Sequence, residues 1–153
     1  MSALSPDTVF QIANRGIIVF WLLLIVAPRW KGTDFLVNSV VVPVVIGLTY
    51  TWLIARVFMG EGAADGSFTS LHGVMAFFTS PVAATAGWIH YLVFDLFIGA
   101  WETRDARRRG VPHLAVIPCL IVTLLFGPIG FLLYLILRAA LGKGGFSLRE
   151  TPA

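Results

Sequence analysis

Four ionisable side chains lie within one apolar stretch, GWIHYLVFDLFIGAWE, over residues 87–102. They belong to His90, Tyr91, Asp95 and Glu102. The stretch is apolar enough to cross a membrane, where an ionisable side chain near the centre costs about 2.5–3.5 kcal/mol. A group held at that cost is a functional hypothesis by default, so this stretch is the first candidate for a site.

A helical projection at about 100° per residue collects most of these groups on one stripe. The stripe spans about 80° of arc and holds an indole, a phenol, two carboxyls and a glycine: Trp88, Tyr91, Asp95, Gly99 and Glu102. His90 falls nearly opposite, so it shares no face with Asp95 on this helix. If the two cooperate, another helix or another protomer must bring them together.

Composition identifies the class of protein. Of 153 residues, 58% are hydrophobic and 12% charged, and the mean hydropathy is +0.86. Soluble domains are about 45–50% apolar and about 25% charged, so this chain is an integral membrane protein. Its net charge of +3 bears on topology and anionic headgroups. Nucleic-acid binding is unsupported, because no basic run is interleaved with aromatic residues in a polar region.

The apolar runs predict an all-α integral membrane protein, a single membrane domain over residues 1–153 with four transmembrane helices. The expected spans are 8–27, 35–58, 81–103 and 114–140. Residues 68–80 are apolar but too short to cross, which predicts an interfacial or re-entrant helix between the second and third spans. Pro43 predicts a kink in the second span, and Gly127-Pro128-Ile129-Gly130 predicts a kink or an unwound turn in the fourth.

The charge distribution predicts an orientation. Four spans would place both termini on one side, and the cations are most concentrated at residues 104–109, at the start of an expected loop. That loop is predicted to be cytoplasmic by the positive-inside rule. Cys119 is the one cysteine, and no Cys/His cluster has metal-ligand spacing, so neither an intramolecular disulfide nor a metal site is expected.

Several motifs resemble the abscisic-acid-deficient-four-like family, small membrane proteins whose plant members are tied to neoxanthin synthesis. The resemblance covers roughly residues 13–141 and includes APRW, WETRDARRRG and LLFGPIG. Its most specific part is W-I-H-x-L-x-x-D-L-F at residues 88–97. The plant members carry a plastid transit region that this chain lacks, so we expect a bacterial version, located in the inner membrane.

The resemblance implies a carotenoid or another isoprenoid lipid as the partner. The plant reaction isomerises a 5,6-epoxide end group to an allenic alcohol without redox change. It needs an acid at the epoxide oxygen and a base at the neighbouring polyene carbon. Asp95 is the predicted acid, because removal from water favours the neutral carboxyl. His90 is the predicted base, or the partner of Asp95 on a facing helix. No cofactor is required.

The remaining candidates are ligand-binding residues. Trp88 and Tyr91 are predicted to stack on the ligand and orient its polar end, and Phe94 to contact it. Asn14 either lines the pocket or bonds a neighbouring helix. Glu102 either joins the site or pairs with the cations at residues 104–109 or with water.

Two other functions remain open on the residues alone. One is a carotenoid- or lipid-binding membrane protein without catalysis. The other is a small proton-coupled transporter that uses Asp95 and the broken fourth helix, which would need several protomers to form a pathway. A homo-oligomer is possible in either case.

Overall fold

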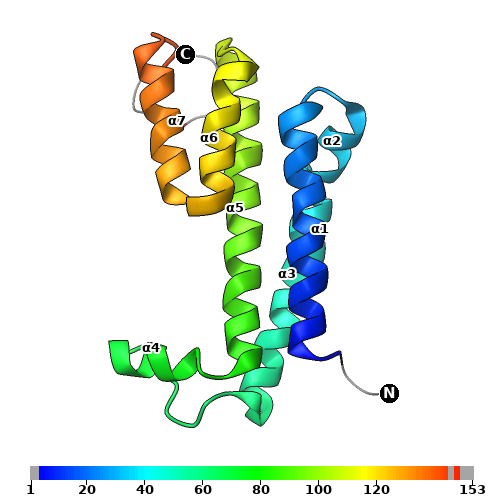
Figure 1. Cartoon of the computed structure of the whole chain (residues 1–153), viewed down its shortest axis with the longest axis vertical. Helices are drawn as coiled ribbons and strands as arrows, with labels where there is room; N and C mark the ends of the chain where they lie inside the picture. The colour runs from blue at the N-terminus through cyan, green and yellow to red at the C-terminus, as the bar shows by residue number, and fades with distance from the viewer. Residues whose placement is uncertain (1–3, 145–146, 149–153) are drawn as a thin grey trace. The chain divides into compact units, whose positions relative to one another are not determined.

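The computed structural model describes residues 4–144, 147 and 148, and this part of the chain is helical without any strand. The helices follow in the order α1 (Pro6–Val26), α2 (Lys31–Leu36), α3 (Val41–Arg56), the π-helical η1 (Val57–Glu61), α4 (Leu71–Phe77), α5 (Pro81–Arg109), α6 (His113–Phe126) and α7 (Pro128–Ala140) (Figure 1). The prediction of an all-α protein is confirmed.

Two compact units make up the chain. Unit 1 comprises the described residues of Met1–Ile17 and Val42–Val93, and unit 2 those of Ile18–Val41 and Phe94–Ala153. Helices α1 and α5 each contribute residues to both units. The candidate residues of the α5 stripe are therefore divided between the two.

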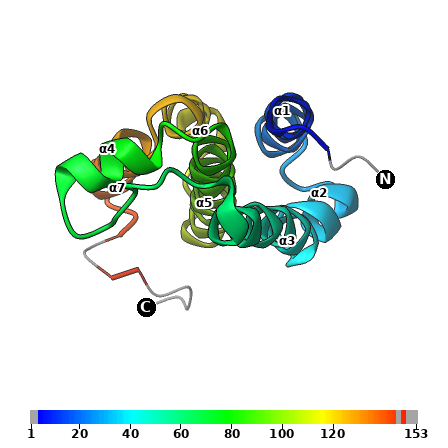
Figure 2. The same ribbon diagram turned by 90° about the horizontal axis from the view of Figure 1, so that it is seen from below.

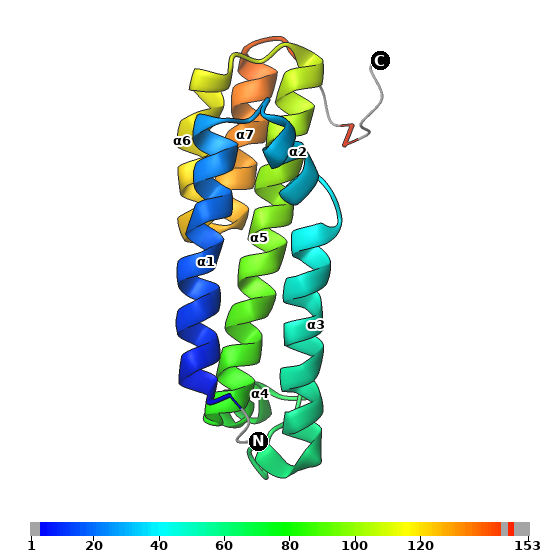
Figure 3. The ribbon, with the colours of Figure 1, turned by 90° about the vertical axis from the view of Figure 1, so that its right-hand side faces the viewer.

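Unit 1 is held together by a core of aliphatic and small residues. Figure 3 shows α3 and the first parts of α1 and α5 running along one another. The small side chains of Ala83 and Ala86 on α5 let the helices approach closely, and both are fully buried. The core consists of Val9, Leu53, Val57, Phe77, Val82, Ala83, Ala86 and Ile89.

The second predicted span begins differently from the expectation. The helix is interrupted at residues 37–40 and resumes as α3 at Val41, so Pro43 lies in the first turn. A proline there displaces no hydrogen bond, because the first N–H groups of a helix have no partner within it. The predicted interior kink at Pro43 is wrong for this reason.

The short helix predicted between the second and third spans is present as α4. It extends across the direction of α5, outward from that helix's first residues (Figure 2). The Ser70 side chain caps α4 by accepting a hydrogen bond from the Gly73 N–H at 3.0 Å. With only seven residues, α4 cannot cross a bilayer.

Unit 2 contains the second half of α5, which is longer than predicted. The helix continues to Arg109, so residues 104–109 are its last turns and not a loop. Gly110 ends it with φ of +67°, and the Val111 N–H donates to the Ala106 carbonyl at 2.9 Å, as in a glycine-terminated helix. The boundary of the predicted third span and the predicted loop are corrected accordingly.

The predicted fourth span is a hairpin of two short helices. Gly127 turns the chain, and α6 and α7 pack side by side against the second half of α5 (Figure 1). They have 14 and 13 residues, whereas a crossing needs about 20. A single helix over residues 114–140 is therefore wrong, and four spans are not confirmed. Pro128 suits its position because it is the first residue of α7.

Among the residues that the structure describes, three helical segments are long and apolar enough to cross a membrane: Pro6–Val26, Lys31–Glu61 and Pro81–Arg109. Many of their large apolar side chains are exposed, as expected where lipid replaces water. The chain is thus a helical membrane protein.

Candidate functional site

The carboxyl group of Asp95 lies against the turn between α6 and α7. Asp95 is 8% exposed, near the middle of α5. A Cβ atom added at Gly127 would lie 2.7 Å from Asp95 Oδ1 and 3.2 Å from Oδ2. Gly127 also has φ of +46°, which residues with a side chain rarely adopt. The turn needs glycine both for its conformation and for this close approach.

A second carboxyl group lies two helical turns further along the same face of α5. Glu102 is fully buried, and its Oε1 accepts a hydrogen bond of 2.9 Å from the Thr123 hydroxyl on α6. Its Oε2 is buried without a hydrogen-bond partner among the described residues. An unsatisfied oxygen of this kind is costly, which marks the site as a functional candidate.

Unit 1 holds the aromatic part of the predicted stripe. The Trp88 indole N–H donates to Asn14 Oδ1 on α1 at 3.1 Å. The Trp88 ring lies with its centroid 5.7 Å from that of Phe10 and 5.3 Å from that of Tyr91. Asn14 thus forms a hydrogen bond between two helices, which is one of the two roles that the sequence suggested for it.

The predicted site residues are distributed over both units. Asp95 and Glu102 share unit 2, where both face the α6–α7 hairpin. Phe94 belongs to the same unit, but its side chain is 56% exposed. Of the two groups predicted to be catalytic, His90 alone lies in unit 1, with its ring centroid 5.6 Å from that of Tyr50 on α3. Neither unit contains both.

Comparisons with known proteins identify the family of this chain. The family model described as ABA DEFICIENT 4-like matches residues 8–134, which is most of the sequence. This chain belongs to the ABA DEFICIENT 4-like family. It is also 24% identical over 142 residues to Protein ABA DEFICIENT 4, chloroplastic, of Arabidopsis thaliana. That alignment covers 90% of this chain and 63% of the relative's length. No solved structure matches.

In this ABA DEFICIENT 4-like protein, sequence reasoning missed a buried ionic network next to the two carboxyls. Asp105 accepts hydrogen bonds from Tyr134 (2.7 Å), Arg138 (2.8 Å) and Arg109 (2.8 Å). Asp105 and Arg138 are each only 1% exposed. The available signal was the spacing of four residues in both Asp105–Arg109 and Tyr134–Arg138, which puts each pair on one helical face.

The Thr123 hydroxyl is expected to stabilise the site measurably. The Thr123→Val variant removes the hydrogen bond to Glu102, and the carboxyl stays buried. The expected loss is about 1–3 kcal/mol of unfolding free energy. Denaturant titration in mixed micelles, followed by circular dichroism, measures it. Thr123→Ser keeps the hydroxyl and is the control, so equal losses in both variants would contradict the role of this hydrogen bond.

Proposed function

We propose that this ABA DEFICIENT 4-like chain acts in carotenoid metabolism, as a membrane isomerase that converts an epoxide end group to an allenic alcohol. The family membership supports a carotenoid-related role, in line with the neoxanthin-linked plant members that the sequence resembles. The observation that carries the catalytic part is the pair of buried carboxyls, Asp95 and Glu102, facing one helical hairpin.

The reaction requires only a proton donor and a proton acceptor. The acid protonates the epoxide oxygen as its bond to the polyene-side carbon breaks. The base removes a proton from the next carbon, and the electrons of that C–H bond form the second double bond of the allene. The oxygen gains one proton and the carbon loses one, so the product is an isomer of the substrate and no electron acceptor is needed.

Asp95 is assigned the role of acid. Its carboxyl is buried against the turn between α6 and α7, where it would donate a proton to a bound epoxide. Glu102 is assigned the role of base, because it shares a unit and a helical face with Asp95 and has an oxygen without a partner among the described residues. Two carboxyls in different environments are a recurrent solution for paired acid and base roles.

The test is pigment analysis of cells that express this chain together with a pathway supplying violaxanthin and zeaxanthin. Wild type is expected to give a new allenic product, and Asp95→Asn to lower its yield at least about 100-fold, the usual scale for removal of a general acid. The control is Asp65→Asn, which neutralises an exposed acid in the loop before α4. Membrane insertion and thermal stability are compared for all three proteins.

Two further variants separate the candidate bases. Loss of product in Glu102→Gln but not in His90→Gln assigns the base to Glu102, and the reverse result assigns it to His90. Carotenoid that co-purifies without any new product would replace the isomerase with a binding function. If the cells contained no new product and the purified protein carried no bound pigment, the proposal would be overturned.

A further inference from the structure

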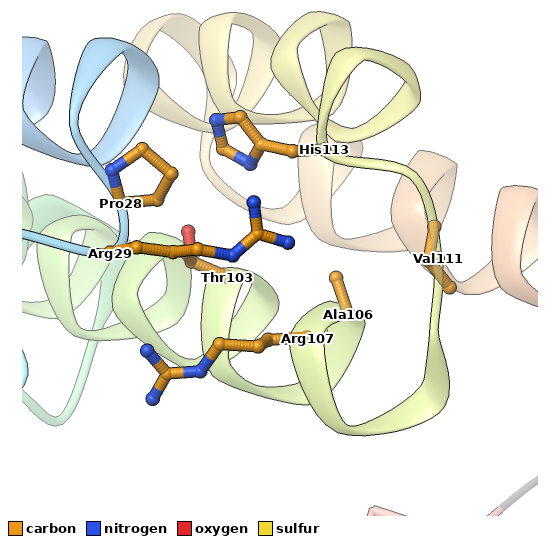
Figure 4. A pocket seen from close by; sticks show the side chains of 7 residues that line it. All are labelled: Pro28, Arg29, Thr103, Ala106, Arg107, Val111 and His113. Atoms are coloured by element: carbon orange, nitrogen blue, oxygen red, sulfur yellow. The ribbon is translucent and has the colours of Figure 1, made fainter.

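A small hollow in unit 2 lies where three parts of the chain meet. The segment after α1, the last turns of α5 and the start of α6 line an open hollow with a cavity volume of about 20 Å³ (Figure 4). It is separate from the Asp95 and Glu102 site, which none of its residues forms. Its lining consists of Pro28, Arg29, Thr103, Ala106, Arg107, Val111 and His113.

Cationic and hydrogen-bonding groups dominate the hollow. Figure 4 shows Arg29 extending across it toward His113. Within residues 4–144, 147 and 148, Arg29 makes no hydrogen bond or ion pair. Arg107 lies 3.6 Å from Asp34, with both side chains nearly half exposed, so that ion pair is weak. The positive charge of the hollow is therefore only partly compensated.

The start of α6 adds to this positive potential. His113 is the first residue of this 14-residue helix, and no side chain caps the helix. The free N–H groups at such an end carry a partial positive charge that favours anions. The His113 ring is fixed by a contact of 2.9 Å between Nε2 and the Ile25 carbonyl. Because a carbonyl only accepts, Nε2 carries the proton.

We propose that this hollow binds the phosphate group of an anionic membrane lipid. The Arg29 guanidinium, which Figure 4 shows beside His113, suits phosphate oxygens, and basic pockets at the ends of membrane helices bind anionic headgroups. The hollow adjoins the ends of two membrane-crossing segments. Trp30, which follows Arg29, is 57% exposed, as is typical of the membrane interface.

Native mass spectrometry of the purified full chain, titrated with phosphatidylglycerol, tests the proposal. Neutralising Arg29 and Arg107 together as glutamines is expected to weaken binding about fivefold for each residue. The matched control is Arg108→Gln, which removes the same charge from α5 outside the lining. Arg29 is exposed, so Arg29→Gln alone keeps the test valid if the double variant does not fold.

Three results would overturn the proposal. One is an equal loss of binding in Arg108→Gln, which would indicate general surface charge. Another is equal binding of phosphatidylcholine, which would remove the requirement for an anionic headgroup. The third is complete displacement of the lipid by millimolar inorganic phosphate, with the same dependence on Arg29, which would make the occupant a free anion. Selective loss in the hollow variants, without displacement by phosphate, supports a lipid.

Discussion

Replacing Asp105 by leucine is expected to unfold unit 2 at a much lower denaturant concentration, at a cost of about 3–5 kcal/mol. The reason is that the substitution leaves the buried Arg138 guanidinium without its counter-ion. That guanidinium is 1% exposed, and Asp105 accepts its hydrogen bond at 2.8 Å. A buried cation without its counter-ion is far costlier than an intact pair or none. Denaturant titration in mixed micelles, followed by circular dichroism, measures the loss.

A second substitution separates this explanation from simple loss of packing. Asp105→Leu combined with Arg138→Met removes both charges and is expected to recover most of the stability. The control is Arg109→Gln, because Arg109 contacts the same carboxyl but is 16% exposed and can be hydrated. If the double variant were as unstable as Asp105→Leu, charge burial would not be the cause.

Gly127→Ala is expected to destabilise unit 2 by about 2–5 kcal/mol and to abolish any activity that depends on Asp95. Two penalties combine in this variant. Alanine is strained at φ of +46°, and its methyl group would lie 2.7 Å from Asp95 Oδ1. Thermal unfolding measures the first consequence, and pigment analysis the second.

The matched control is Gly47→Ala in α3, where an added Cβ meets no atom within 4 Å. This variant is expected to be as stable as wild type or slightly more so, because alanine favours helix. Combining Gly127→Ala with Asp95→Ala should remove the steric part of the penalty and leave the conformational part. An unchanged cost in that background would contradict a direct contact with Asp95.

The sequence predicted the structural features that depend on local patterns, and it did not predict those that depend on contacts between distant residues. Long apolar runs specify helices in a membrane, and these were predicted. The projection of α5 correctly put Asp95 and Glu102 on one face, since helical periodicity is local. A break at Gly127-Pro128 was also predicted, but a Gly-Pro pair is compatible both with a kink in one helix and with a turn between two helices. Only contacts between α5, α6 and α7 decide between these, and contacts are not encoded in periodicity.

The end of α5 was mispredicted for a related reason. Charged residues after an apolar run are typical of a loop, whereas here Asp105 is buried by Arg138, which lies 33 positions later. Likewise, sequence alone could not pair Trp88 with Asn14, 74 positions away. The catalytic and ligand-binding roles of the site residues stay predictions, because geometry places the groups without showing a substrate.

The short helices α6 and α7 have a consequence for how the protein is made. A helix needs about 20 apolar residues to cross the bilayer by itself, and neither helix reaches that length. Their turn would also leave polar backbone facing hydrocarbon if no protein surrounded it. We therefore expect the two helices to insert as a pair against α5. Docking of the hairpin on α5 is therefore expected to be a separate step of assembly, and Glu102 and Asp105 on α5 are part of the surface that receives it.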